Sequence, residues 1–396
     1  MPKTDSNHIK ELLNRGVSAV YPTPEALEKF LTSGKTLKLY HGIDPTGSTL
    51  HLGHLVQLLK LKQFQDLGHQ VIILIGDFTA QIGDPTDKSA TRKPLTKKQV
   101  LQNCKNYKKQ IGKILNLKKT KFVFNSKWLE KMNFADVLKL TSEFTVQRLL
   151  ERDMFENRIK EGKPIHLHEF LYPVMQGYDS VALDVDLEIG GNDQTFNMLA
   201  GRTLMRSLKN KEKMVLTTKL LVDPSGKKMG KTEGNMITLA DQANDVYGKV
   251  MSWSDELILP GFEILTKVPM SEVEVLADEI KRGENPKTAK MLLAYKVVEL
   301  LFDVKAAISA EENFKQVFQE GLNPDEIPVF QTEARNIVEV LVASGMASSK
   351  TEARRLIQQG GVKVDEKIVK DENFEIEMHA NGVVIQKGKR HFIKIK

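Results

Sequence analysis

Cysteine is almost absent from this chain, which has only Cys104 among its 396 residues. A single cysteine excludes an internal disulfide framework and a cysteine-based zinc cluster. Long apolar runs are absent too, since the longest aliphatic run, residues 71–75, is far too short to span a bilayer. The first residues, MPKTDSNHIKELLNRG, lack the apolar core of a signal peptide. We therefore expect a cytoplasmic protein with no membrane partner.

Acidic residues are missing from one long stretch. The whole chain has 58 Lys and Arg against 51 Asp and Glu, and this net charge of +7 says little by itself. Between Asp87 and Glu130, however, lysine is frequent and no acidic residue occurs. The spacing of Val100, Tyr107 and Ile111 predicts a helix over residues 96–115 that carries much of this charge. The block is either a solvated helix surface or a contact for a polyanion such as RNA.

The chain divides into an α/β part, a helical part and a small tail. Residues 35–43, 70–76, 121–125, 183–189 and 214–217 are predicted strands, and residues 52–67 a helix. A strand–helix–strand unit implies a parallel sheet with a right-handed crossover. We predict an α/β fold with a Rossmann-like domain over residues 1–239, a helical domain over 240–320, a proline-containing linker over 321–331 and a small α+β domain over 332–396.

The loop after the first predicted strand carries two histidines. Residues 42–54 read GIDPTGSTLHLGH, and they end where the helix begins. Ligands bind at the carboxyl ends of parallel strands, and a helix N-terminus with two imidazole donors favours a phosphate. Gly53, between His51 and His54, would let a nucleotide approach closely. The alternative is that both histidines only cap the helix, and their spacing suggests no third ligand for zinc.

A second candidate for phosphate binding is a basic loop punctuated by glycines. Residues 226–232 read GKKMGKT, with three residues between the glycines where a Walker A loop has four. The preceding DPSG is a turn rather than the end of a strand, which also argues against a Walker A loop. The lysines of this loop could close on a polyphosphate, or the loop could simply be flexible and basic.

Together these two segments resemble the HIGH and KMSKS signatures of class I aminoacyl-tRNA synthetases. YHGIDPTGSTLHLGH, IGDPT at 82–86, YPVMQGYD at 172–179 and EIGGNDQ at 188–194 are similar to segments of the bacterial-type tyrosyl-tRNA synthetases. The resemblance implies that tyrosine reacts with ATP to give tyrosyl-adenylate and pyrophosphate, and that the tyrosyl group then moves to the 3′ end of tRNA(Tyr). It implies no covalent enzyme intermediate, so catalysis would rest on positioning and electrostatics.

The resemblance also implies roles for individual residues. The triphosphate would be held by Thr46, His51, His54, Lys228, Lys231 and Thr232, with Lys88 and Arg92 as additional cations. The nucleotide would contact Gly42, Asp44, Gly53, Gly191 and Asp193. The tyrosine pocket would consist of Tyr40, Thr79, Asp84, Tyr172, Gln176, Asp179 and Gln194. Tyr40 and Asp179 would bind the phenol, and Asp84, Tyr172 and Gln176 the ammonium group.

The spacing of three pocket residues supports this assignment. Tyr172, Gln176 and Asp179 follow one another at four and three residues and so share one face of a helix, although an ordinary polar stripe has the same spacing. Several positions depart from the family pattern, among them Leu52, Asn192, Gly230 and Glu188. Gly230 replaces a serine, and Glu188 stands where better-known members have glutamine. A carboxylate at position 188 would alter the electrostatics around the substrate, so the role of Glu188 stays open.

The C-terminal segment resembles a second known module. Ser349 and Glu352 fit a capping box, the helix ends at Gly360–Gly361, and a VKV strand follows. Residues 332–396 contain 12 basic and 9 acidic residues, a net charge of +3. This order resembles the αL-motif RNA-binding domain shared with a small-subunit ribosomal protein. The resemblance implies that Lys350, Arg354 and Arg355 contact tRNA.

The family resemblance also implies partners for this chain, and three other functions are compatible with parts of its sequence. The family implies a homodimer, with residues 127–161 as a plausible interface, ATP as a substrate, Mg²⁺ accompanying ATP, and no zinc. A tryptophanyl-tRNA synthetase is the nearest alternative, because it shares the class and fold. A small-molecule nucleotidyltransferase could also use two histidines on phosphate. A non-catalytic RNA-binding relative is a third possibility, although both histidines and both signature lysines are present.

Overall fold

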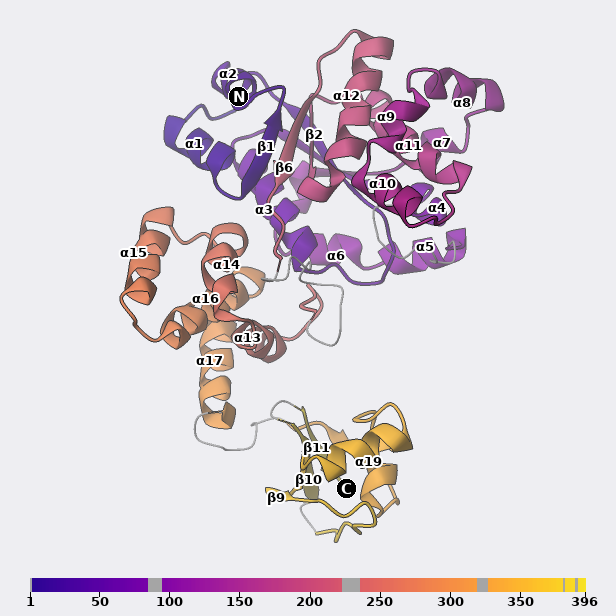
Figure 1. Cartoon of the computed structure of the whole chain (residues 1–396). Helices are drawn as coiled ribbons and strands as arrows, with labels where there is room; N and C mark the ends of the chain where they lie inside the picture. The colour runs from indigo at the N-terminus through magenta and orange to yellow at the C-terminus, as the bar shows by residue number, and fades with distance from the viewer. Residues whose placement is uncertain (1, 85–94, 223–235, 319–326, 380–381, 389–390) are drawn as a thin grey trace.

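The computed structural model describes residues 2–84, 95–222, 236–318, 327–379, 382–388 and 391–396 (Figure 1). Its first part is built on a six-stranded sheet in the order β1-β6-β5-β2-β3-β4. The strands are β1 (Val17–Tyr21), β2 (Lys38–Ile43), β3 (Gln70–Ile75), β4 (Thr120–Phe124), β5 (Leu187–Gly191) and β6 (Met214–Thr218). Strands β2 to β6 pair in parallel, whereas β1 pairs antiparallel with β6. The predicted α/β class with a parallel sheet is confirmed.

Helices surround this sheet and bury both of its faces. Every residue of β5 and β6 is buried, as expected for parallel strands that are covered on both faces. The surrounding elements are α1 (Ser6–Asn14), α2 (Pro24–Thr32), α3 (Leu52–Asp66), α4 (Thr79–Ile82), α5 (Lys97–Cys104), α6 (Tyr107–Ile111), η1 (Leu117–Lys119), α7 (Ser126–Leu129), α8 (Phe134–Thr141), α9 (Val146–Leu150), α10 (Asp153–Lys160), α11 (Leu167–Leu183), η2 (Asn192–Gln194) and α12 (Thr195–Lys209). Helix α3 is the crossover between β2 and β3.

Three elements differ from the prediction. Strand β1 is not among the predicted strands, because it is a short edge strand that is only partly buried. The strand predicted over residues 183–189 begins only at Leu187, since α11 extends to Leu183 and ends at Asp184 in a left-handed conformation with φ of 49°. The helix predicted over residues 96–115 is two shorter helices, α5 and α6.

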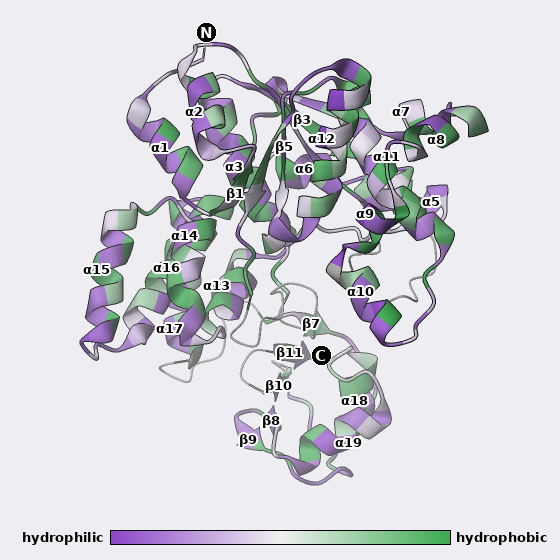
Figure 2. Cartoon of the chain, turned by 45° about the horizontal axis from the view of Figure 1, so that its top comes forward, coloured by the Kyte–Doolittle hydropathy of each residue, from purple (hydrophilic) through white to green (hydrophobic). Residues whose placement is uncertain are grey.

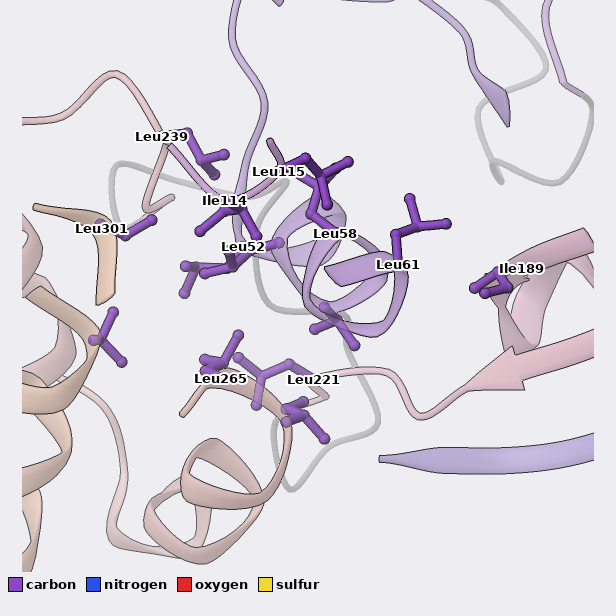
Figure 3. Packing of buried hydrophobic residues seen from close by; sticks show 14 of the residues in the cluster. Leu52, Leu58, Leu61, Ile114, Leu115, Ile189, Leu221, Leu239, Leu265 and Leu301 are labelled. Carbon is purple, nitrogen blue, oxygen red and sulfur yellow. The ribbon is translucent and has the colours of Figure 1, made fainter. Parts of the chain in front are cut away.

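The second part of the chain is helical, and its core is continuous with that of the sheet. Its elements are α13 (Ala243–Met251), η3 (Asp255–Leu257), α14 (Ile258–Leu265), α15 (Met270–Lys281), α16 (Pro286–Leu301) and α17 (Val304–Phe318). Figure 3 shows Leu52 and Leu58 of α3 in one apolar cluster with Leu265 and Leu301. In the described ranges, no helix is long and apolar enough to cross a membrane. The domain boundary at residue 239 stays a prediction.

The C-terminal part has a sheet and a core of its own. The elements are β7 (Val329–Phe330), α18 (Ile337–Ala343), α19 (Lys350–Gln358), β8 (Val362–Val364), β9 (Lys367–Ile368), β10 (Val383–Lys387) and β11 (His391–Ile395), with strand order β7-β11-β10-β8-β9. Ile357 of α19 and Ile385 of β10 are buried in this separate core.

The predicted capping box of α19 is only half correct. The hydroxyl of Ser349 accepts from the Glu352 backbone N–H at 3.2 Å. The Glu352 carboxylate, however, accepts from the backbone N–H of Ser348 at 2.7 Å instead of that of Ser349. The hydroxyl of Ser348 also donates to the Glu352 carboxylate, and this second hydrogen bond favours Ser348 over Ser349 as its partner.

Candidate active site

The two histidines close the N-terminus of α3. His51 is its N-cap, and His51 Nδ1 accepts from the Gly53 backbone N–H at 3.1 Å. His54 Nδ1 accepts from the His51 backbone N–H at 3.2 Å, and the ring centroids lie 4.1 Å apart. When Nδ1 accepts, the proton of a neutral imidazole is on Nε2. Both rings therefore present an Nε2–H donor, as a phosphate site requires.

Gly53 is explained by its contact with His51. A Cβ atom at position 53 would lie 2.8 Å from His51 Cε1 and 2.9 Å from its Nδ1. The glycine thus allows the capping geometry of the ring, a reason that the sequence alone does not reveal. Its predicted contact with ATP stays a prediction.

Helices α5 and α6 hold the loop that leads to these histidines. Asn103 donates to the Pro45 carbonyl at 2.8 Å, and the Tyr107 hydroxyl donates to the Gly47 carbonyl at 2.6 Å. Gln110 accepts from the Leu50 backbone N–H at 2.7 Å. The exposed Thr46 lies inside this clamped segment. The sequence analysis did not assign these three side chains to the site, because it considered this segment only for its helical spacing and its charge.

Asp44 lies at the centre of a buried hydrogen-bond network. Its Oδ1 accepts from the Thr79 hydroxyl at 2.7 Å, and its Oδ2 accepts from the Tyr172 hydroxyl at 2.8 Å. Burial raises the pKa of Asp44 to about 7, although both hydrogen bonds oppose that shift. A Cβ at Gly76 would lie 1.9 Å from Asp44 Oδ1 and 2.4 Å from Thr79 Oγ1, so only glycine fits there. The structure thus joins Asp44, expected beside ATP, to two residues expected around tyrosine.

Asp84 lies between an amide and a buried guanidinium. Gln194 donates to Asp84 Oδ2 at 2.7 Å, and Arg152 Nη2 lies 3.6 Å from Asp84 Oδ1. Phe155 and Phe196 contact the guanidinium carbon at ring-centroid distances of 5.6 and 5.3 Å. Arg152, from the turn before α10, is not among the predicted residues, and no sequence motif marks it.

Asp179 is a buried carboxylate held by two donors. Trp128 Nε1 donates to its Oδ1 at 2.8 Å, and Asn125 Nδ2 lies 3.3 Å from its Oδ2. Asn125 also donates to the Thr79 hydroxyl at 3.1 Å. Burial raises the pKa of Asp179 well above its usual range, and the two hydrogen bonds only partly offset this. Asn125 directly follows β4, so its position at the end of a parallel strand was the signal that could have identified it.

Tyr40 and Gln176 contact two buried side chains, Ser180 and Glu188. The Tyr40 hydroxyl is 2.9 Å from the Ser180 hydroxyl, and Gln176 Nε2 donates to Glu188 Oε1 at 3.2 Å. Burial raises the pKa of Tyr40 well above its usual range. Glu188, whose role the sequence left open, is therefore connected to the predicted tyrosine pocket.

The remaining residues predicted to contact the nucleotide lie in or directly after two strands of the sheet. Gly42 in β2 and Gly191 at the end of β5 lie near the carboxyl ends of adjacent parallel strands. A Cβ at Gly191 would lie 2.5 Å from Asp193 Oδ1, so this glycine allows the Asp193 carboxylate to stay where it is. These positions meet at the same sheet edge as the histidine loop.

The other predicted residues lie either outside the described residues or in the C-terminal part. Lys88, Arg92, Lys228, Lys231 and Thr232 lie outside the described residues. Lys350, Arg354 and Arg355 are on α19, where Lys350 contacts Glu339 at 3.1 Å and Arg354 contacts Glu372 at 3.4 Å. Across the described ranges, no three His, Cys, Asp or Glu side chains gather as a metal site would need.

Comparison with known proteins gives matches over nearly the whole chain. Residues 32–319 match the family model described as tRNA synthetases class I (W and Y), and residues 335–380 match the S4 domain. A tyrosine–tRNA ligase of Carboxydothermus hydrogenoformans is 45% identical over 407 residues, covering 100% of this chain and 99% of the relative. One from Thermotoga maritima is 44% identical, covering 97% of this chain and 96% of its own.

Solved structures show the same fold at lower identity. A C-terminally truncated mitochondrial tyrosyl-tRNA synthetase of Aspergillus nidulans superposes with a TM-score of 0.67 at 23% identity, covering 78% of this chain and 94% of that one. The tyrosyl-tRNA synthetase of Archaeoglobus fulgidus, solved with L-tyrosine, gives a TM-score of 0.61 at 24% identity, covering 77% of this chain and 100% of its own.

Proposed function

The chain belongs to the tyrosine–tRNA ligase family of class I tRNA synthetases, an ATP-dependent ligase family, and we propose that the cluster around Asp44, Asp84 and Asp179 binds the tyrosine that it attaches to tRNA(Tyr). The reaction has two steps. Tyrosine's carboxylate displaces pyrophosphate from ATP, and the adenylate then transfers its acyl group to the 3′ end of the tRNA. The single observation that supports this function best is the buried Asp179 carboxylate, held by Trp128 and Asn125 beside Tyr40.

The phenol end of the substrate fits this carboxylate. A buried carboxylate that stays unpaired is costly, and a phenol hydroxyl supplies a further donor to it. Phenylalanine supplies none and would leave Asp179 and Tyr40 without that partner. We propose that Asp84, Tyr172, Gln176 and Gln194 surround the ammonium end, with Thr79 supporting Asp44 between the two ends.

The phosphate end fits the histidine loop. As pyrophosphate leaves, negative charge builds on the phosphoryl oxygens, and fixed donors stabilise it. We assign this role to the Nε2–H groups of His51 and His54 and to Thr46, together with Lys228, Lys231 and Thr232. Lys88 and Arg92 would add positive charge, and Gly42, Gly53, Gly191 and Asp193 would line the nucleotide. Mg²⁺ would enter with ATP, since this ion keeps several waters and binds through substrate phosphates and one or two carboxylates.

Contact with tRNA is assigned to two basic surfaces. In the S4 domain, α19 exposes Arg354 and Arg355 in the described structure. In the first part, α5 and α6 carry lysines of the acid-free block and also hold the histidine loop. Phosphate contacts by lysine and arginine release counterions, so charging of tRNA should weaken as salt rises.

The experiment that tests the whole reaction is aminoacylation. We expect radiolabelled tyrosine to become attached to tRNA(Tyr) in the presence of ATP and Mg²⁺. A small-molecule nucleotidyltransferase would instead form an adenylate and never charge tRNA. Adenylate formation without charging, with intact tRNA supplied, would therefore contradict the proposed function.

A homodimer is proposed from exposed apolar side chains in the segment predicted as an interface and just beyond it. Phe134 is 77% exposed and Leu167 is 79% exposed, with Leu138, Val146 and Ile159 also exposed among α8 to α11. Figure 2 shows hydrophobic segments on α8 and α10 at the periphery. Exposed apolar side chains of this size can mark an interaction surface, and a second copy of the chain would cover them.

Charge introduced into this surface should produce monomers. We expect Phe134→Glu combined with Leu138→Glu to shift sedimentation from a dimer to a monomer, because buried carboxylates would lack partners in the interface. Val275→Glu on α15 is the matched control, since Val275 is also exposed but lies in the helical part. If the control dissociates as well, or the double variant stays dimeric, this surface is not the interface.

Asp44 predicts a pH dependence of tyrosine binding. With its pKa at about 7, the ionised fraction rises roughly tenfold between pH 6 and pH 8. Tyr172, which donates to Asp44, lies at the proposed ammonium end of the substrate. The positive charge of tyrosine therefore favours the ionised Asp44 carboxylate, and KM for tyrosine should fall by up to about tenfold as pH rises over this range. Steady-state kinetics should show this slope in the wild type and a flatter one in Asp44→Asn. An equal slope in both proteins would contradict the assignment.

A further inference from the structure

A lysine is completely buried beneath the proposed tyrosine pocket. Lys213, directly before β6, has 0% of its side chain exposed, and Glu188 in β5 has 2%. The two form an ion pair between adjacent parallel strands. Lys213 Nζ also donates to the Ser180 hydroxyl at 2.8 Å and to the Met198 carbonyl at 3.0 Å. All three protons of the ammonium group therefore have acceptors.

The surrounding backbone is shaped to admit this ammonium group. A Cβ atom at Gly201 would lie 2.5 Å from Lys213 Nζ and 2.7 Å from Ser180 Oγ. Gly201 lies in α12, where glycine costs helix stability compared with alanine. Burial lowers the pKa of Lys213, and the charge of Glu188 opposes that shift. Such a buried ion pair contributes little to the stability of the fold, because both charges lose their hydration, but it can hold neighbouring groups in one arrangement.

The pair determines how the Gln176 amide is oriented. Glu188 Oε2 is engaged by Lys213, and Glu188 Oε1 accepts from Gln176 Nε2 at 3.2 Å. An ionised carboxylate offers acceptors only, so the amide nitrogen of Gln176 must face it. The Gln176 carbonyl oxygen is then on the other side of the amide. A carbonyl in that place can accept from a substrate ammonium group, whereas an NH₂ group would repel it.

We propose that Lys213 and Glu188 are positioning residues that make Gln176 present its carbonyl oxygen to the ammonium group of tyrosine. This inference rests on the proposed function, in which Gln176 contacts that group. The Lys213 ammonium group needs an acceptor at residue 188. Glu188 provides one oxygen to Lys213 and its second oxygen to the Gln176 amide. The ion pair thus influences substrate binding through the orientation of the Gln176 amide.

Glu188→Gln is the informative change, because Lys213 should orient the new amide. The introduced amide would turn its oxygen toward Lys213 and its NH₂ toward Gln176. Gln176 would then flip and present its own NH₂ to the substrate ammonium. We expect KM for tyrosine to rise about tenfold to one-hundredfold, with kcat changed less than about threefold, as loss of a hydrogen bond to a charged group predicts.

Removing the lysine should reverse this effect. In Glu188→Gln with Lys213→Met, no ammonium group draws the oxygen of the introduced amide toward position 213. That oxygen can then accept from the NH₂ group of Gln176, and Gln176 can again present its carbonyl oxygen to the substrate. We expect KM for tyrosine to return to within about threefold of the wild type. A purely structural role of Lys213 predicts the opposite result, namely further damage from the second substitution.

An analogue without the ammonium group provides the specific control. 3-(4-Hydroxyphenyl)propionate keeps the phenol and the carboxylate, so its inhibition constant should change less than about twofold in Glu188→Gln. Thermal melting should accompany each measurement. Glu188→Gln should not raise KM further when Gln176 is already replaced by methionine, because the effect passes through the Gln176 amide. Comparing Gln176→Met with the double variant Gln176→Met, Glu188→Gln therefore tests the inference even if one single variant folds poorly.

The outcomes separate this inference from the function on which it rests. If the wild type fails to activate tyrosine, the proposed function fails. If the wild type is active, the inference is overturned by any of three results: an unchanged KM in Glu188→Gln, an equal loss of affinity for the analogue, or no recovery in the double variant.

Discussion

Replacing His54 by asparagine is expected to leave α3 intact and to slow tyrosyl-adenylate formation by about 100-fold to 1,000-fold. Asparagine places its Oδ1 near the position of His54 Nδ1, so it can still accept from the His51 backbone N–H. It has no donor at the position of Nε2, however. Removal of one fixed donor to a developing oxyanion has an effect of this size in other enzymes.

Glutamine at position 54 provides the matched control. Its amide reaches the position of Nε2 and keeps a donor there, but it loses the acceptor close to the backbone that caps α3. We expect His54→Gln to retain more adenylation activity than His54→Asn while losing about 1 kcal/mol of stability, the usual cost of a helix cap. Single-turnover adenylate formation and urea unfolding measure the two effects. Equal rates in the two variants would show that the distal nitrogen is not the group that matters.

Substitution of Asp179 by alanine should weaken the preference for tyrosine over phenylalanine by about 100-fold. A hydrogen bond from the substrate phenol to a buried carboxylate contributes up to about 3 kcal/mol, which corresponds to roughly 100-fold in kcat/KM for tyrosine. Activation of phenylalanine should change little, since phenylalanine makes no such bond. The ratio of the two kcat/KM values should therefore fall by about 100-fold.

Trp128→Phe tests whether the carboxylate must also be held in place. This change removes the indole donor at 2.8 Å from Asp179 while keeping an aromatic side chain. We expect a smaller fall in the tyrosine-to-phenylalanine ratio, about threefold to tenfold, as for one hydrogen bond. ATP–pyrophosphate exchange with each amino acid gives both ratios. A loss of activity that is equal for the two amino acids would mean that Asp179 has a structural role instead.

The fold could be predicted from the sequence wherever an element had a strong local signal. The predicted strand–helix–strand unit over residues 35–76, which corresponds to β2, α3 and β3, identified the parallel sheet and its crossover. Strand β1 and the end of α11 at Asp184 were missed for different reasons. β1 is stabilised by pairing with β6, and Asp184 adopts a left-handed conformation that glycine more often occupies.

The candidate site could be predicted in part because some of its residues form motifs. His51, His54, Tyr172 and Asp179 belong to recognisable segments, and the structure places the side chains of Tyr172 and Asp179 in one network with Asp44 and Thr79. The groups that hold them come from elsewhere in the chain. Trp128, Arg152 and Lys213 reach the site only through folding, so local sequence carries little sign of their role.

Glu188 illustrates why the sequence alone was insufficient. A carboxylate in place of glutamine appeared as an unexplained change of charge in the pocket. Its explanation is Lys213, which is 25 residues away in sequence and directly beside it in the fold. The compensating charge could be recognised only once β5 and β6 were known to be neighbours.

The most direct test of the account is ATP–pyrophosphate exchange with purified protein and single amino acids. The family model that matches this chain covers enzymes for both tryptophan and tyrosine, so these two substrates are the decisive comparison. We predict exchange with tyrosine and none above background with tryptophan. Exchange with tryptophan and not with tyrosine would contradict the assignment of Asp179, Tyr40 and Gln176 to a tyrosine pocket.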